Sequence, residues 1–161
     1  HPSNSVTNLS IEEAKEIFAG EITNWSELGG TDEEIAVYHR ASGSGTRETF
    51  VDHLMGDREV TLEAVTKESN GSMRQAISDN PSGIGYVGFG YVDDSVESVS
   101  LDGIKPSAET AASGEYPISR HLHMYTDGEP TGLTKDFIEF IFSEEGQKIV
   151  EEQGFIKVAR E

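Results

Sequence analysis

Apolar residues recur every three or four positions in several stretches of the chain, which is the spacing of one buried helix face. The first such stretch follows Ser10, which forms a capping-box pattern with Glu13, and Gly20 is placed to end it. Two further helices are predicted to begin near Thr46 and near Ser69. The last third of the chain repeats the pattern and is predicted to be helical.

Short apolar runs between turn residues predict strands at 35–38, 84–87 and 96–101. Alternating apolar and polar positions predict a further strand at 116–125. Strands that alternate with helices are typical of an α/β architecture, which is the fold class that we expect.

The composition excludes several classes of protein. The 161 residues include 12 Lys and Arg against 30 Asp and Glu, a net charge of −18. Such a chain lacks the basic face that nucleic acids require, and an anionic membrane surface repels it. No apolar run approaches the roughly 18 residues of a membrane span, so we expect no membrane insertion by this segment. The excess of acid fits ordinary solubility or adaptation to high salt.

A strand, a loop of small residues and a helix start follow one another over residues 37–50. The first N–H groups of a helix have no partner inside it, and the helix dipole favours an anion there. Arg40 adds a planar fork for two oxygens, while Ser44 and Thr46 add hydroxyl donors. The pattern indicates an anion site, and the alternative is a plain Gly/Ser turn beside a surface arginine.

No catalytic or metal motif accompanies this loop. No lysine follows its second glycine as in a nucleotide P-loop, and Ser44 has neither a GxSxG context nor a His–Asp pair. His121 and His123 lie two apart with no third ligand in their motif, and His39 is expected in a turn. The chain has no cysteine. We therefore expect no enzyme, no cofactor and no metal site.

Five stretches form a set in a fixed order along nearly the whole chain: LSIEEAKEIFAGEITNWSELGG, RASGSGTRETF, SNGSMRQAISDNPSGIGYVGFGY, YPISRHLHMYTDGEP and FIEFIFSEEGQKIVEEQGF. Together they resemble the PstS-like phosphate-binding proteins of ABC-type phosphate importers. The resemblance implies a type II periplasmic-binding-protein fold, whose lobe has a mixed sheet flanked by helices. It divides the chain into an anion-binding lobe with its hinge strands at 1–125 and a helical segment at 126–161.

The phosphate ligands that the resemblance implies fall on one loop: Arg40, Ser44, Gly45 and Thr46. Further candidates in this loop and at the next helix start are Ser42, Gly43, Asn70 and Gly71. Ser42 and Gly43 are expected to shape the loop. For Asn70 and Gly71 a plain helix cap is an equal alternative.

Members of the family carry a further segment before the motif that begins here at Leu9, and it supplies an acidic residue for the proton of hydrogen phosphate. We expect this chain to be the second lobe plus the C-terminal part of the first. The resemblance implies a non-enzymatic, extracytoplasmic receptor for inorganic phosphate that serves an ABC permease. A receptor for sulfate or another tetrahedral oxyanion, and a sensory or interaction module that reuses the lobe, remain as alternatives.

Overall fold

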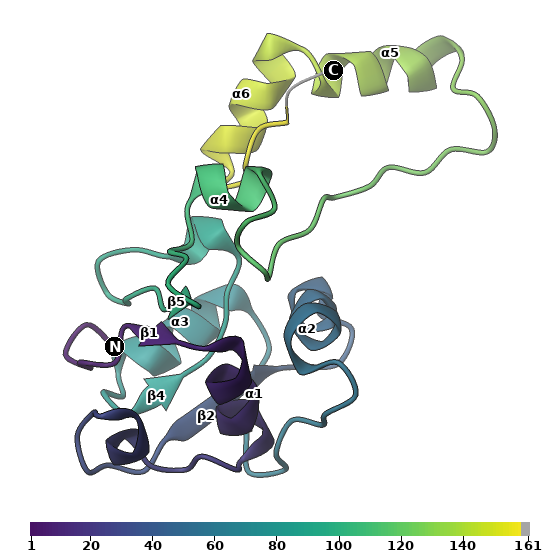
Figure 1. Ribbon diagram of the computed structural model, residues 1–161. Helices are drawn as coiled ribbons and strands as arrows, with labels where there is room; N and C mark the ends of the chain where they lie inside the picture. Colours follow the sequence, from purple (N-terminus) through teal and green to yellow (C-terminus); the bar gives the residue numbers. More distant parts are fainter. Residues whose placement is uncertain (159–161) are drawn as a thin grey trace. The chain divides into compact units, whose positions relative to one another are not determined.

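The computed structural model describes residues 1–158 and divides into two compact units. The first unit is His1–Ser119, and the second begins at Arg120. Helices flank parallel sheets in the first unit (Figure 1), which confirms the predicted α/β class. The assignment of the first unit as an anion-binding lobe that ends at residue 125 stays a prediction.

The helices and strands of the first unit are short and alternate along the chain (Figure 1). In order they are β1 (Asn8–Leu9), α1 (Ile11–Ala19), η1 (Trp25–Leu28), β2 (Ala36–Arg40), α2 (Gly45–Phe50), η2 (Val51–Met55), β3 (Val65–Lys67), α3 (Asn70–Ser78), β4 (Gly83–Ile84), η3 (Phe89–Tyr91), β5 (Ser100–Leu101) and α4 (Ala108–Ala112). The turns η1 and η3 are 3₁₀-helical, and η2 is a π-helical continuation of α2.

Two parallel sheets form the frame of this unit. β2 is the central strand of a three-stranded sheet in the order β3-β2-β4, and β1 pairs with β5. Arg40 at the end of β2 lies opposite Lys67 at the end of β3. The antiparallel contacts between described residues are two isolated bridges. Because the strands are parallel, the carboxyl ends of β2 and β3 meet at one edge, where ligands of open α/β sheets bind.

α1 begins and ends where the sequence predicts. The Ser10 hydroxyl accepts a hydrogen bond from the Glu13 N–H at 3.1 Å, and the Glu13 carboxylate accepts one from the Ser10 N–H at 2.7 Å. Gly20 ends the helix with φ at 78°, in the left-handed region that favours glycine.

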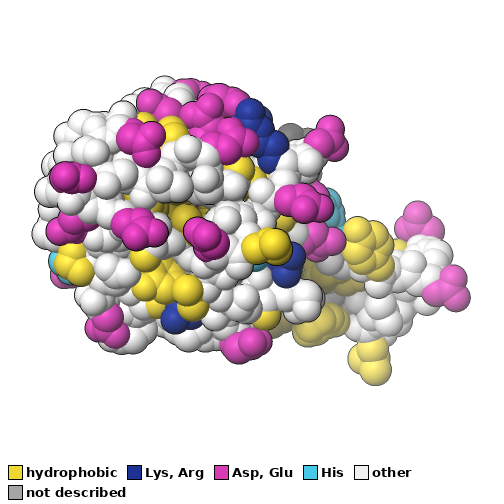
Figure 2. All heavy atoms as spheres, turned by 90° about the horizontal axis from the view of Figure 1, so that it is seen from below, with side chains coloured by type: hydrophobic (Ala, Val, Ile, Leu, Met, Phe, Trp, Pro, Cys, Tyr) yellow, Lys and Arg dark blue, Asp and Glu magenta, His cyan; other side chains and the backbone are white. Residues whose placement is uncertain are grey.

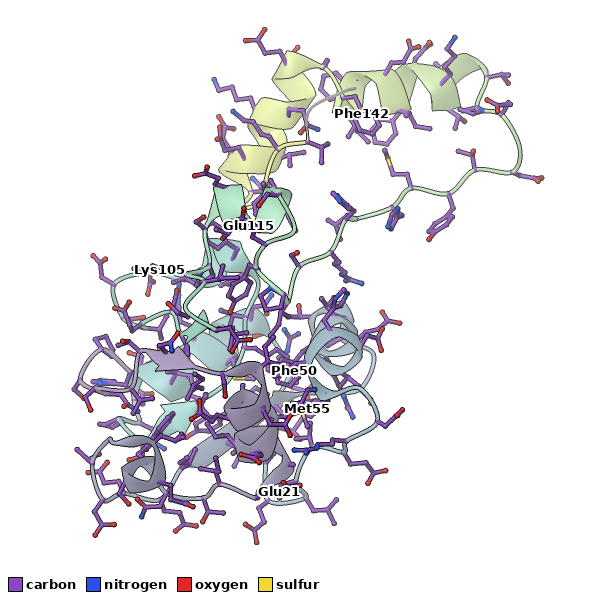
Figure 3. All side chains as sticks on the ribbon, viewed as in Figure 1. Glu21, Phe50, Met55, Lys105, Glu115 and Phe142 are labelled. Atoms are coloured by element: carbon purple, nitrogen blue, oxygen red, sulfur yellow. The ribbon has the colours of Figure 1, made fainter. Side chains whose placement is uncertain are left out.

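The buried face of α1 packs against α2, η2 and the sheet. The Phe18 and Phe50 rings meet edge to face with centroids 4.5 Å apart, and Figure 3 labels Phe50 and Met55 on the segment beside α1. Trp25 is buried too, and its indole N–H donates to the Ser82 carbonyl at 3.0 Å. The core residues are Leu9, Ala14, Ile17, Phe18, Trp25, Ile35, Val37, Phe50, Leu54, Met55, Ile84 and Leu101.

Several strands differ from the prediction. The strands predicted at 84–87 and 96–101 shorten to Gly83–Ile84 and Ser100–Leu101. The strand predicted at 116–125 is wrong, because these residues form bends and irregular backbone. A strand needs a neighbouring backbone to receive its hydrogen bonds, whereas an alternating pattern fixes only which face is apolar.

The second unit contains α5 (Gly132–Ile141) and α6 (Glu144–Glu152), as predicted for this part of the chain. The Ser143 hydroxyl caps α6 by accepting from the Gly146 N–H at 3.1 Å. Gln147 is buried, and its side-chain amide donates to the Ile141 carbonyl at 2.9 Å. No helix within residues 1–158 is both long and apolar enough to cross a membrane.

Candidate functional site

Arg40 ends β2 at the carboxyl edge of the sheet, with only 8% of its surface exposed. Its Nη1 donates to the Asn70 side-chain oxygen at 2.6 Å, and its Nη2 donates to the Glu68 carbonyl at 3.2 Å. Its Nε is buried and has no acceptor within residues 1–158. A buried donor without an acceptor costs about 1–3 kcal/mol, so this nitrogen marks where a further acceptor would be favourable.

The backbone of Arg40 is held by Tyr86. The Tyr86 hydroxyl accepts from the Arg40 N–H at 3.1 Å and lies 2.6 Å from His39 Nδ1. The Tyr86 ring stacks on Phe50, with centroids 3.9 Å apart and planes at 7°. The side chain of Tyr86 therefore joins the end of β2 to α2.

His39 is neutral in this arrangement. Burial, with the nearby Arg47 charge adding to it, lowers the pKa of His39 to about 4. The Tyr86 hydroxyl and His39 Nδ1 share a hydrogen bond, and His39 Nε2 is buried without a partner within residues 1–158. His39 lies in β2 with 7% of its surface exposed, so its prediction as a turn residue is wrong. The apolar run at 35–38 ends one residue before His39, so the sequence pattern does not place His39 in the strand.

The loop after Arg40 leads directly into α2. Gly43 adopts φ of 83°, which accounts for a glycine there, and Ser42 and Gly43 are exposed. The Ser44 hydroxyl oxygen caps α2 by accepting from the Arg47 N–H at 3.2 Å, which leaves its own proton free to donate. Gly45 and Thr46 are the first two residues of α2 and are half-buried. Their N–H groups have no partner inside the helix.

The sequence candidates therefore fall into two groups around one arginine. Ser44, Gly45 and Thr46 follow Arg40 along the chain, whereas Asn70 reaches it across 30 residues. The cap of α3 is Ser69, whose hydroxyl accepts from the Ser72 N–H at 3.0 Å. The alternative of Asn70 as a plain cap is thus wrong. Gly71 lies in the first turn of α3, where a Cβ would make an ordinary contact with the Ser69 hydroxyl at 3.8 Å.

Two residues that support Arg40 carry no signal in the sequence. The hydrogen bond from the Arg40 N–H to the Tyr86 hydroxyl spans 46 positions. Arg47 was not a candidate, although its Nη1 lies 3.5 Å from the Arg40 carbonyl. Neither position belongs to a local motif.

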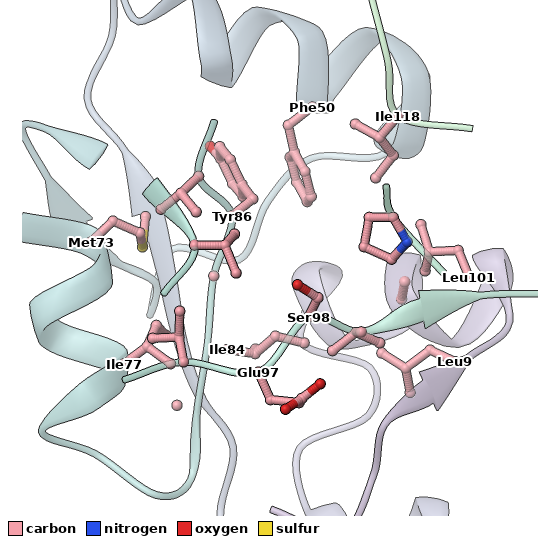
Figure 4. Close-up of a pocket in the computed structure, with 18 of the residues that line it drawn as sticks. Leu9, Phe50, Met73, Ile77, Ile84, Tyr86, Glu97, Ser98, Leu101 and Ile118 are labelled. Carbon is pink, nitrogen blue, oxygen red and sulfur yellow. The ribbon is translucent and has the colours of Figure 1, made fainter. Parts of the chain in front are cut away.

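The first unit also contains a cavity at another place. It encloses about 250 Å³, and its lining is mostly apolar, with Phe50 and Tyr86 side by side in the wall (Figure 4). Arg40 and residues 41–46 do not line it. Arg74 lines this cavity, and its Nη1 forms an ion pair with Asp93 at 2.7 Å. This apolar space does not suit an oxyanion, so the loop remains the candidate site.

The acceptors that contact Arg40 are uncharged, although the chain as a whole is strongly acidic. Asp and Glu side chains are spread over the face in Figure 2, and few Lys or Arg accompany them. Both acceptors of Arg40 are uncharged oxygens. The Debye length is about 8 Å at physiological salt, so distant carboxylates are screened while donors in contact with a ligand are not.

No group of three or more His, Asp or Glu side chains within residues 1–158 is arranged to hold a metal ion. The rings of His121 and His123 lie 6.5 Å apart in the second unit.

Comparison with protein families matches residues 1–145 to a PBP superfamily domain. The chain is 45% identical to the phosphate-binding protein PstS of Bacillus subtilis, over 98% of this chain and 53% of that protein. It is 34% identical to PstS of Borreliella burgdorferi, over 98% of this chain and 61% of that protein. The chain thus spans little more than half the length of these relatives.

Solved structures give the same result. An ABC-type phosphate transport receptor from Vibrio cholerae superposes with a TM-score of 0.83 at 33% identity, over 98% of this chain and 67% of that one. A Clostridium perfringens protein, assigned as the substrate-binding protein of a phosphate ABC transporter, contains bound phosphate. It superposes with a TM-score of 0.86 at 38% identity, over 98% of this chain and 66% of that one.

Proposed function

The chain belongs to the PBP superfamily, and from this premise we propose that it is the anion-binding part of a non-enzymatic phosphate receptor. The relatives reported above are named for phosphate binding or phosphate transport, and one contains phosphate. By the same reasoning the partner of the receptor is the permease of an ABC importer, and its place is outside the cytoplasmic membrane.

One observation carries the assignment to a site: Arg40 is buried, is held by two neutral acceptors, and keeps its Nε without an acceptor in the described chain. The Ser44 and Thr46 hydroxyls and the first N–H groups of α2 lie in the segment that follows it. An oxyanion placed there receives charged and neutral hydrogen bonds together.

Sulfate is the second candidate, because Arg40 and the N–H groups of α2 only donate, and the set contains no carboxylate. Donors serve both tetrahedral anions equally, whereas recognition of the proton of hydrogen phosphate needs an acceptor. A sulfate titration beside the phosphate titration separates the two ligands.

The test is a titration of the ¹⁵N-labelled chain with inorganic phosphate, followed by the amide signals of Gly45 and Thr46. These signals should shift saturably. Arg40→Ala should weaken binding about ten- to hundredfold, since a hydrogen bond to a charged group contributes about 1.5–3 kcal/mol. Arg40→Lys should recover only part of this loss, because an ammonium lacks the planar fork.

The matched control is Arg58→Ala, which removes the same charge but alters ion pairs with Glu12 and Glu21. Its phosphate affinity should equal that of the unaltered chain. Equal affinity in the Arg40 variants, or shifts that bypass the loop, would show that phosphate does not bind at this site.

A further inference from the structure

The Asn70 side chain does not cap α3, although Asn70 lies at the start of this helix. It is the first residue of α3, but Ser69 caps this helix through a capping box with Ser72. The Asn70 side-chain oxygen instead accepts from Arg40 Nη1 at 2.6 Å and from the Gly88 N–H at 3.4 Å. The amide of Asn70 thus links the arginine to the loop after β4.

Two hydrogen bonds fix the plane of the Arg40 guanidinium. Asn70 holds Nη1, and the Glu68 carbonyl holds Nη2 at 3.2 Å. A guanidinium has five N–H donors, and within residues 1–158 two of them are used, which leaves three, with the buried Nε among them. A planar donor set in a fixed orientation loses less conformational freedom when it binds an oxyanion.

We propose that Asn70 is a positioning residue, whose neutral amide orients Arg40 while leaving the arginine's positive charge for the oxyanion. The inference rests on the proposed function and adds the reason for an amide at this position. An aspartate has nearly the same shape and would keep the hydrogen bond. Its carboxylate, however, would compensate the charge of Arg40 and repel an incoming anion.

The choice is notable in this chain, which carries 30 Asp and Glu residues. Both partners of the buried arginine are nevertheless uncharged: the Asn70 amide and a backbone carbonyl. The arginine is therefore held by dipoles instead of an ion pair, and its charge remains available to a ligand.

The test compares Asn70→Ala, Asn70→Asp and Ser69→Ala in the same NMR titration with inorganic phosphate. Asn70→Ala should weaken binding about three- to tenfold, because an average hydrogen bond is lost. Asn70→Asp should weaken it more than Asn70→Ala at pH 7, even though the shape is kept. Ser69→Ala weakens the cap of α3 but leaves the partner of Arg40 in place, so its phosphate affinity should stay unchanged.

Two readouts separate positioning from a structural role. In an Arg40→Ala background, Asn70→Ala should cause no further loss, because the group that it orients is gone. The defect of Asn70→Asp relative to the unaltered chain should shrink only as the pH falls below about 4, because the Arg40 charge lowers the pKa of the new carboxyl below the usual value for aspartate. The other charged or titratable side chains on and beside these elements are the same in both proteins: Tyr38, His39, Arg47, Glu48, Lys67, Glu68, Arg74 and Tyr86.

Different results would overturn different claims. Phosphate shifts that are absent from the unaltered chain would remove the proposed function, and this inference with it. Normal binding by Asn70→Asp at pH 7 would overturn the inference alone. An Asn70→Ala loss that persists without Arg40, or an equal loss in Ser69→Ala, would also overturn it. Urea unfolding of each variant shows that the comparison is made between folded proteins.

Discussion

Tyr86→Phe removes one oxygen atom that serves both the fold and the candidate site. The hydroxyl accepts from the Arg40 N–H at 3.1 Å and lies 2.6 Å from His39 Nδ1. Phenylalanine keeps the ring stacked on Phe50, so the apolar packing stays. The change therefore isolates the two polar contacts.

The expected cost follows from what is left without a partner. The Arg40 N–H loses its acceptor, which costs about 1–3 kcal/mol for a buried group, and the hydrogen bond to His39 contributes about 1 kcal/mol more. The free energy of unfolding should fall by about 2–4 kcal/mol. Phosphate affinity should fall several-fold as well, because the backbone that carries the Arg40 side chain loses its anchor.

Urea unfolding measures the first quantity, and the NMR titration measures the second. Tyr38→Phe is the matched control: it removes a hydroxyl that accepts from the Asn80 side chain at 3.0 Å, a hydrogen bond in which Arg40 takes no part. It should cost about 1 kcal/mol and leave phosphate affinity unchanged. An unaltered urea midpoint for Tyr86→Phe at an unaltered m-value would refute the role given to its hydroxyl.

Two further changes test the structure. The pKa of His39 is lowered by burial from 6.5 to about 4, so the unfolded chain takes up a proton that the folded chain rejects. The free energy of unfolding should therefore fall by at most about 3 kcal/mol as the pH drops from 6.5 to 4. His39→Asn, measured by urea unfolding, should lack this part of the pH dependence. A pH profile of His39→Asn like that of the unaltered chain would contradict the role given to His39. In the second unit, Gly146→Ala should destabilise α5 and α6 by about 1–3 kcal/mol, because the added Cβ would meet the carbonyls of Phe140 and Ile141. Amide hydrogen exchange measures this loss, and a gain of about 1 kcal/mol, as helix propensity alone favours, would show that the backbone yields easily.

The local features of the fold could be predicted from the sequence. The Ser10–Glu13 capping box, the Gly20 stop and the start of α3 after Ser69 all depend on contacts within a few residues. The same is true of the loop from Arg40 into α2, where the order strand, small residues, helix start already indicates an anion site. The α/β class follows from the alternation of such elements.

The environment of Arg40 was decided by the tertiary structure alone. Its contacts with Asn70 and Tyr86 cross 30 and 46 residues, and they exist because β3 and β4 pair in parallel on either side of β2. The strand predicted at 116–125 is wrong for the same reason, because an alternating pattern indicates which face of a strand is apolar but not which strand it pairs with. Capping and turn signals act through neighbouring backbone groups, so they can be predicted from the sequence. The orientation of a buried guanidinium depends on the register between strands, which no local pattern contains.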